Sequence, residues 1–425
     1  MNRSGMNRLR DNLVALSMLQ AFNYAAPLVT VPYLVRVLGP AHFGMLSLAQ
    51  ALVLYLDLLT NYGFDLSATR AVACLRHDRE ALALAFWRTM YAKATLMLVS
   101  AAALALLVAA VPRFRAMPML YAGAFLTVVG SAAFPAWFFQ GIERMRPIAI
   151  AQASARLLTI PALILLVKQP HDLIRAAAIQ GSVPVLASTL LLPVACKINI
   201  GRPLLPCLSG IASTLKGGWH VFVAQSGMAM NLSTTAVILG LIAGDAAVGY
   251  YGAADKVIRA VTSMLGPIAQ ALYPHLNHLK TQSPAEMSRL MRKSFTWILL
   301  LAFGASFAAL ALAGPAGALL WGPEFGRSVA ILRCLSPLPL LLALINVMGT
   351  QTMLVFEMDT ALSRVVIAGS LANLLLTALG SAALGGLGAA AALVGTTAVM
   401  AAGLARALYK RFSLRRLSLR ATCVP

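Results

Sequence analysis

The sequence predicts an all-α protein that crosses a membrane about twelve times, with its helices in two six-helix bundles. The prediction depends on an apolar composition, on evenly recurring apolar stretches, and on where the basic residues fall. Of the 425 residues, 60% are hydrophobic and only 11% are charged, against about 25% charged in an ordinary soluble domain. The mean hydropathy is +0.81. No single core could bury so much apolar surface, so lipid must solvate much of it. A soluble enzyme, a disulfide scaffold and a disordered chain are thereby excluded.

The first apolar stretch is long enough to span a membrane. It begins near Leu13 and continues past Tyr33. No small-residue cleavage site interrupts it, so we expect a retained span rather than a cleaved signal. Because Arg3, Arg8 and Arg10 precede it, we expect the amino terminus in the cytoplasm.

Further apolar stretches recur along the chain with short breaks. Twelve helices of ~20 residues would use about 240 residues and leave roughly 15 for each connection, so no large soluble domain fits. The expected spans cover residues 12–35, 43–62, 89–111, 118–139, 148–167, 174–196, 220–243, 250–272, 294–313, 329–349, 361–384 and 387–408.

The basic residues distinguish the two sides of the membrane. With both termini in the cytoplasm, 24 of the 34 Lys and Arg residues fall on the cytoplasmic side, five of them assigned to the connection between the second and third spans. Seven fall on the periplasmic side, and Arg156, Lys256 and Arg259 lie inside spans. This is the positive-inside pattern. It accounts for most of the net charge of +21, so no nucleic-acid partner is needed to explain the basic composition.

The longest expected cytoplasmic connection lies at the middle of the chain. It covers residues 198–219 and is rich in Gly and Pro. We therefore expect an N-terminal six-helix bundle over 1–197, a C-terminal bundle over 220–408, and a basic cytoplasmic tail over 409–425.

A short repeat supports two related halves. Gly39-Pro40-Ala41-His42-Phe43-Gly44 follows the first span, and Gly244-Asp245-Ala246-Ala247-Val248-Gly249 follows the seventh. Both spans leave the cytoplasm, so the repeat is parallel rather than inverted. Parallel halves are related by an axis along the membrane normal, and a binding site is expected between them.

Three charged residues stand together in the eighth span. On a helix, Asp255 and Arg259 are four residues apart and Lys256 and Arg259 are three apart, so they share one side. An ionisable group in a span is costly and normally faces a partner or a water-filled cavity. An Asp255–Arg259 pair could simply neutralise charge. Because that pair would leave Lys256 without a partner, the sequence favours a hydrated cationic cavity.

Three further charged residues are candidates for the same cavity. Arg156 lies near the middle of the fifth span, and a cavity role is favoured over pairing with Asp57 across helices. Asp57 in the second span and Asp255 are candidate coupling or charge-balancing groups, although Asp57 could equally be a structural partner for an arginine. Arg36 ends the first span and either contacts ligand or extends outward to water. A cavity rich in Arg and Lys suits an anionic substrate, because guanidinium binds phosphate through two hydrogen bonds.

Neither cofactor nor metal is predicted. The five cysteines are scattered without a CxxC motif, and the six histidines form no HExxH or comparable cluster. These patterns indicate neither a metal site nor a disulfide framework.

Several stretches resemble one family of membrane proteins. They are Leu19-Gln20-Ala21-Phe22-Asn23-Tyr24 with Pro32 to Gly44, Asn61 to Arg70, Tyr250 to Lys256, Gly266 to Pro274, and Trp321-Gly322-Pro323-Glu324-Phe325. These stretches resemble bacterial polysaccharide repeat-unit flippases. Such proteins are the Wzx-type O-antigen transporters of the multidrug/oligosaccharidyl-lipid/polysaccharide (MOP) flippase superfamily.

The resemblance implies a MOP/MATE-like transporter of the bacterial inner membrane without enzymatic activity. Its substrate would be an undecaprenyl-diphosphate-linked oligosaccharide, moved from the cytoplasmic to the periplasmic leaflet by alternating access for surface polysaccharide biosynthesis. Its partners would be membrane lipids, a polysaccharide polymerase and a chain-length regulator. The match in the eighth span implies that Asp255, Lys256 and Arg259 line the cavity, whereas Arg156, Asp57 and Arg36 are inferred from the residues.

Two alternatives stay open at this point. A small-molecule or multidrug exporter of the same superfamily would be expected to show acidic groups for cationic drugs, and here basic groups dominate the spans. A lipid-linked-sugar polymerase would need a sizeable periplasmic loop with catalytic groups. The longest outer connection, about 314–328, is short and holds only Glu324 and Arg327 as charges.

Overall fold

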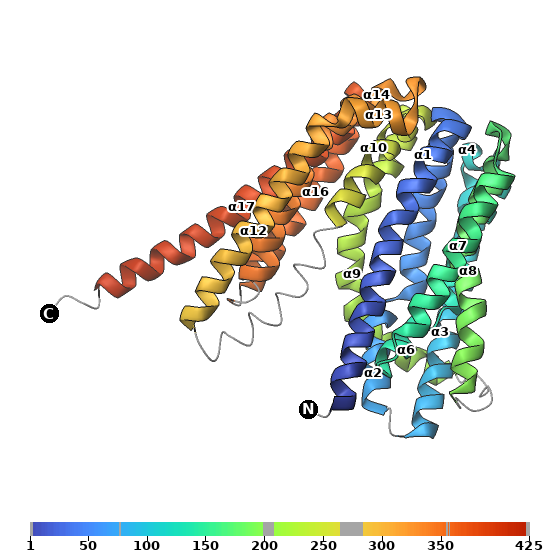
Figure 1. Cartoon of the computed structure of the whole chain (residues 1–425), viewed down its shortest axis with the longest axis horizontal. Coiled ribbons are helices and arrows are strands. Elements are labelled where there is room, and N and C mark those ends of the chain that lie inside the picture. The colour runs from blue at the N-terminus through green and yellow to red at the C-terminus, as the bar shows by residue number, and fades with distance from the viewer. Residues whose placement is uncertain are drawn as a thin grey trace. The chain divides into compact units, whose positions relative to one another are not determined.

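The computed structural model describes residues 3–75, 78–198, 208–263, 284–353, 356 and 358–421. Across these ranges the chain consists of helices and short connections, with no β-strand. Nine helices in the described ranges are long and apolar enough to cross a membrane. The chain divides into two compact units, unit 1 (Met1–Val237) and unit 2 (Ile238–Pro425), coloured blue to green and yellow to red in Figure 1. The predicted all-α membrane fold is confirmed, while the count of twelve crossings and the orientation stay predictions.

The helices of unit 1 pack mainly around α5. This helix contacts α1, α3 and α8, and α7 packs against both α1 and α8. The elements are α1 (Arg3–Asn61), α2 (Phe64–Leu75), α3 (Arg79–Ala110), α4 (Pro112–Arg115), α5 (Pro118–Ala133), α6 (Ala136–Gly141), α7 (Arg146–Leu166), the 3-10 turn η1 (Pro170–Asp172), α8 (Leu173–Lys197) and α9 (Leu208–Ala243), which continues into unit 2. Residues 199–207 of the predicted linker lie outside the described residues. The predicted domain limits at 197 and 220 stay predictions.

The first two predicted spans lie on one long helix with a break. Within α1, Gly39 has φ 70° and ψ 175°, a conformation that interrupts the helix and that glycine adopts without a Cβ clash. Pro40 follows, at a first-turn position where its missing N–H costs nothing. The predicted repeat partner Gly244 also has a positive φ, of 85°, directly before α10. The first glycine of each repeat therefore separates two helical segments.

Two kinds of contact hold unit 1 together. Helices α5 and α8 approach so closely at Gly130 that an added Cβ would lie 2.2 Å from the Val185 backbone nitrogen, as small residues allow in membrane helices. At the end of the unit where α2, α3 and α6 meet (Figure 1), an aromatic cluster is buried. There the Phe86 ring lies 5.6 Å from the Trp137 ring and 5.1 Å from the Phe138 ring, both typical contact distances.

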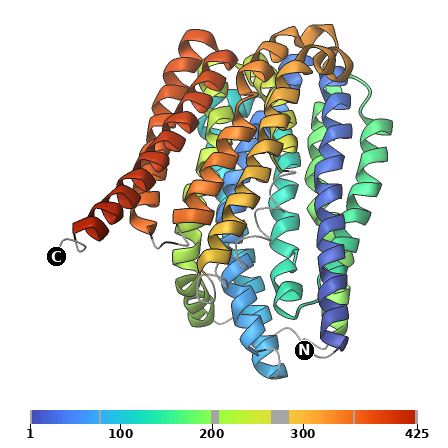
Figure 2. The same ribbon diagram turned by 60° about the vertical axis from the view of Figure 1, so that its left-hand side comes forward.

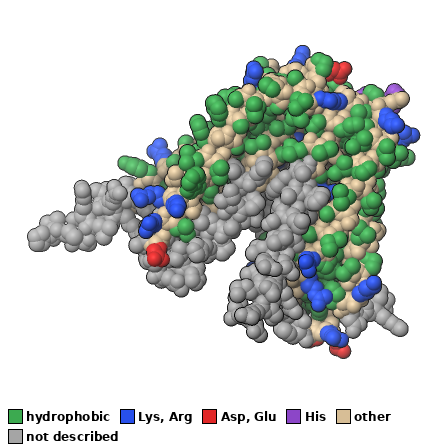
Figure 3. Space-filling view, viewed as in Figure 1, with side chains coloured by type: hydrophobic (Ala, Val, Ile, Leu, Met, Phe, Trp, Pro, Cys, Tyr) green, Lys and Arg blue, Asp and Glu red, His purple; other side chains and the backbone are tan. Residues whose placement is uncertain are grey.

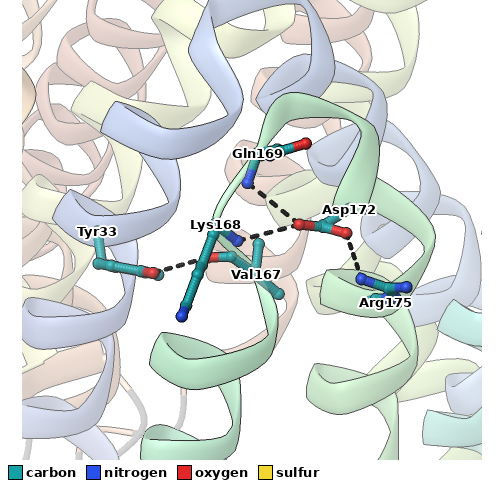
Figure 4. A network of polar contacts seen from close by, with 6 residues as sticks. All are labelled: Tyr33, Val167, Lys168, Gln169, Asp172 and Arg175. Carbon is teal, nitrogen blue, oxygen red and sulfur yellow. Dashed lines mark hydrogen bonds and ion pairs between the residues drawn. The ribbon is translucent and has the colours of Figure 1, made fainter.

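The connection between α7 and α8 is held by a network of polar contacts (Figure 4). The Tyr33 hydroxyl of α1 lies 2.6 Å from the Val167 carbonyl oxygen. Asp172 accepts hydrogen bonds from the backbone N–H groups of Lys168 and Gln169, each at 3.1 Å. Its other oxygen pairs with Arg175 at 2.7 Å. These contacts satisfy backbone groups between two helices that would otherwise need water.

Unit 2 is built on α16 and α17, which lie side by side (Figure 2). Other contacts within the unit include those of α14 with α10 and α17, and those of α15 with α12 and α17. The elements are α10 (Asp245–Ser263), α12 (Pro284–Ala311), α13 (Ala313–Trp321), the 3-10 turn η2 (Pro323–Phe325), α14 (Gly326–Leu335), α15 (Leu338–Ile345), the π-helix η3 (Asn346–Met353), α16 (Asp359–Leu384) and α17 (Gly386–Ala421).

The described helices of unit 2 differ from the predicted spans in three places. The predicted span 250–272 is helical to Ser263, and residues 264–272 lie outside the described part of the chain. The predicted span 329–349 is not one uniform helix, because α14 ends before Pro337 and η3 follows α15. Helix α17 continues to Ala421, so most of the predicted basic tail is helical.

The outer surface is apolar where it would meet lipid. Large hydrophobic side chains are exposed on many helices, including Leu106 at 71% and Leu371 at 62%. In the view of Figure 3, hydrophobic side chains cover the middle of the described helices, and Lys and Arg side chains gather nearer their ends. A soluble protein rarely exposes such an extended apolar surface. The chain is a multi-pass membrane protein.

Candidate functional site

The charged residues of α10 form an ion pair on a single helix. The Arg259 Nε donates a hydrogen bond to Asp255 Oδ2 at 2.5 Å. The two side chains are 40% and 15% exposed, respectively. Their spacing of four residues places them on one face, as the sequence predicted. The neutralising pair that the sequence raised as an alternative is therefore present.

Lys256 is not left alone beside this pair. Its ammonium group interacts electrostatically with Asp255, so one carboxylate serves two cations. Contrary to the expectation from the sequence, pairing of Asp255 with Arg259 does not leave Lys256 without a partner. The three side chains carry a net charge of +1, from two cations and one anion. Their role as cavity residues stays a prediction.

Arg156 of α7 has unused hydrogen-bonding capacity. It is half-buried, and its Nε is enclosed without a hydrogen-bond partner. Within the described part of the chain, no ion pair joins Arg156 to Asp57, so the alternative of a cross-helix pair between these two is not found. A buried donor without an acceptor is costly and is usually satisfied by a ligand or water.

Asp57 instead belongs to a polar network inside unit 1. Its Oδ2 accepts a hydrogen bond from Asn61 Nδ2 at 3.1 Å, and the same amide group donates to Ser131 Oγ of α5 at 2.9 Å. The Ser131 carbonyl accepts a hydrogen bond from Lys93 Nζ of α3 at 2.7 Å. The other carboxylate oxygen of Asp57, Oδ1, is buried without a partner. Three helices thus meet around one buried carboxylate.

Lys93 was misplaced by the count of basic residues. Only Arg70, Arg76, Arg79 and Arg88 lie between the second and third predicted spans, so the fifth base assigned to that connection is Lys93. The structure places it inside α3 with only 1% of its surface exposed. Lys93 lies within the predicted span 89–111, so the sequence could have identified it as a charged residue inside a span. It was counted with the cytoplasmic connection because it lies near that end of the span.

Arg36 lies apart from these clusters in the sequence of α1. It is exposed, three residues before the break at Gly39. Its side chain or backbone also interacts with another group of the protein. Among the described residues, no group of three or more His, Cys, Asp and Glu side chains could hold a metal ion.

Comparison with known proteins places the chain in a family. The family model described as "Polysaccharide biosynthesis protein" matches residues 9–280. The chain belongs to this polysaccharide biosynthesis family. A protein of Escherichia coli (strain K12) named "Putative O-antigen transporter" is 32% identical over 371 residues, which cover 87% of this chain and 89% of the relative. A protein of the same name from Shigella dysenteriae is 26% identical over 370 residues, which cover 86% of this chain and 91% of the relative.

Solved structures share the fold at low sequence identity. An inward-facing MATE family transporter of the MOP superfamily matches with a TM-score of 0.69 and 14% identity, over 97% of this chain and all of that one. The lipid II flippase MurJ in an inward closed conformation matches with a TM-score of 0.72 and 10% identity, over 93% of this chain and 87% of that one. The predicted MOP/MATE-like fold is confirmed. Both relatives are named as transporters.

Proposed function

We propose that this member of the polysaccharide biosynthesis family is a flippase for lipid-linked sugars. It moves undecaprenyl-diphosphate-linked oligosaccharide repeat units from the cytoplasmic to the periplasmic leaflet of the bacterial inner membrane, by alternating access. The units then supply surface polysaccharide such as O-antigen, capsule or exopolysaccharide. The observation that carries this proposal is the family match over residues 9–280, with O-antigen transporters among the relatives.

The basic residues of the spans suit the anionic part of that substrate. Arg156 offers a buried Nε donor without a partner, and a guanidinium group binds phosphate oxygens more strongly than it binds neutral acceptors. Lys256 and Arg259 place two cationic side chains beside one carboxylate in the eighth predicted span. We assign these three residues to the diphosphate, and Arg36 to a further contact at the end of the first predicted span.

The acidic residues have the complementary role of balancing charge. Asp255 holds the Arg259 guanidinium in place, so an arriving phosphate would compete with it for the same group. Asp57 balances positive charge inside unit 1 through its interaction with Lys93. We therefore assign both aspartates to charge balance or ion coupling rather than to direct contact with the anionic substrate.

A leaflet assay tests the proposal. Lipid-linked repeat units are made in cells with and without this gene, and a glycan-modifying enzyme is applied from the periplasmic side. We expect depletion to trap intact units on the cytoplasmic face, out of reach of that enzyme. Units that cross but stay unpolymerised would support a polymerase instead. Unaffected lipid-linked sugars would support a small-molecule or multidrug exporter.

Variants of the basic residues test the assigned site. Arg156→Ala, and Lys256→Ala with Arg259→Ala, should each lower the transport of repeat units about tenfold or more, because roughly 1.4 kcal/mol of lost interaction gives a factor of ten. The matched control is Arg175→Ala, which also removes an arginine from an ion pair with aspartate. Control transport should be unchanged. Normal transport by both sets of variants at equal membrane abundance would contradict the assignment.

A further inference from the structure

Lys93 has few hydrogen-bond partners for a charged side chain that is buried inside a membrane protein. Its side chain is 1% exposed, and its ammonium group donates one hydrogen bond, to the Ser131 carbonyl oxygen. An ammonium group has three donors. A charged side chain within a span is normally kept only where it has a partner or a function.

The counter-charges of Lys93 come from two helices. Lys93 interacts electrostatically with Asp65 of α2 and with Asp57 of α1. The charges that act on Asp57 are likewise Lys93 and Asp65, and its hydrogen-bond partners are the uncharged side chains of Asn61 and Ser131. Asp65 is exposed, whereas the Asp57 Oδ1 is buried and has no hydrogen-bond partner. That buried oxygen is where a proton would bind.

Asp57 and Asp65 lie on either side of the connection between α1 and α2, Tyr62-Gly63, which we call the α1–α2 joint. Helix α1 ends at Asn61, and Tyr62 and Gly63 have φ of 46° and 72° before α2 begins. These left-handed conformations turn the chain sharply. The Tyr62 ring stacks on the Phe222 ring of α9, with centroids 4.6 Å apart. A Cβ on Gly63 would lie only 2.6 Å from the Val221 side chain.

We propose that Asp57 is a proton-binding site and that Lys93 converts its occupancy into movement of the α1–α2 joint. With Asp57 ionised, both Asp57 and Asp65 attract the Lys93 ammonium. When the Asp57 carboxylate accepts a proton and becomes a neutral carboxyl group, Lys93 keeps its charge and Asp65 alone attracts it. The electrostatic attraction between Lys93 and α2 then changes. The joint transmits the resulting movement of α2 to α9, which it contacts through Tyr62 and Gly63. As a coupling site for transport, this inference rests on the proposed flippase function.

A cysteine pair placed at the joint can report this movement directly. An added Cβ on Gly218 of α9 would lie 3.5 Å from Ser67 Oγ of α2, so cysteines at these two positions would lie within reach of each other. The full chain carries Ser67→Cys and Gly218→Cys, with its five native cysteines replaced by alanine, and sits in lipid nanodiscs. The rate of disulfide formation is measured from neutral to acidic pH. Because thiol ionisation itself changes this rate, each profile is compared with that of a matched variant at the same pH.

Asp57→Asn gives the decisive comparison, because it mimics the neutral carboxyl group. We expect it to match the parent protein at acidic pH and to differ about fivefold or more at neutral pH, the lower range of typical coupling between sites. When Lys93→Met is added to both proteins, the difference that Asp57→Asn makes should disappear. Asp57→Glu should keep the parent profile. Parent and Asp57→Asn profiles that coincide at every pH would overturn the proposal.

A second measurement separates this inference from the transport function. In vesicles with lipid-linked oligosaccharide and an imposed pH gradient, Asp57→Asn should lose the response to the gradient. An equal response in Asp57→Asn and parent protein would also overturn the proposal. The cross-linking needs no substrate. A pH-dependent joint in a protein that fails the leaflet assay would therefore support the proton site while refuting the flippase.

Discussion

The two charged centres of the molecule are built in opposite ways. In unit 2, Asp255, Lys256 and Arg259 lie within five residues of one helix, and the Arg259 side chain is 40% exposed. In unit 1, the centre around Lys93 draws on α1, α2, α3 and α5, and Lys93 is buried. A centre on one helix keeps its geometry whenever that helix forms. A centre across several helices depends on their packing, so it responds to that packing and can also control it.

Removing Lys93 should have the largest effect on stability. Lys93→Met removes a buried ammonium group, its hydrogen bond to the Ser131 carbonyl oxygen, and the positive charge that acts on Asp57. Leaving a buried charge uncompensated in this way costs about 3 kcal/mol or more. The free energy of unfolding of purified protein in detergent is the measurement. Because removal of both charges is far less costly than removal of one, Lys93→Met with Asp57→Asn should recover part of the loss. Strictly additive losses would show that Lys93 and Asp57 act independently.

The corresponding single and double substitutions in unit 2 should change the free energy of unfolding much less. Arg259→Gln breaks the pair with Asp255, but partly exposed pairs within a helix contribute about 0.5 kcal/mol. The fold should therefore tolerate this change even where transport of repeat units falls. Unfolding free energies for Arg259→Gln, Asp255→Asn and the double variant test this expectation. A loss as large as that of Lys93→Met would remove the distinction between the two centres.

The difference between the centres also explains what the sequence could predict. Hydropathy and length were enough to predict an all-helical membrane fold, because each membrane helix satisfies its own backbone groups. Residue spacing was enough for the Asp255–Arg259 pair, because neighbours on one helix are fixed by its geometry. The partners of Asp57 could not be predicted in this way. Asn61 is one turn away in the sequence, but Lys93 and Ser131 come from other helices, and only tertiary packing brings them together.

The joint between α1 and α2 was hidden for a related reason. Asn61-Tyr62-Gly63 reads as the end of a span, and the left-handed conformation of Tyr62 has no strong sequence signal. Contact with Phe222, 160 residues later, is a feature of the fold. The break inside α1 at Gly39 was easier to predict, because glycine followed by proline marks a local interruption.

The smallest effect is expected at the exposed pair between η1 and α8, which serves as a reference for burial. The Arg175–Asp172 distance is 2.7 Å, close to that of Arg259–Asp255, and both aspartates are 15% exposed. Arg175, however, is 68% exposed, and Asp172 keeps its two backbone hydrogen bonds when Arg175 is replaced (Figure 4). Arg175→Gln should therefore leave the unfolding free energy unchanged within error. A loss equal to that of Arg259→Gln would mean that geometry alone, and not burial of the arginine, sets the strength of both pairs.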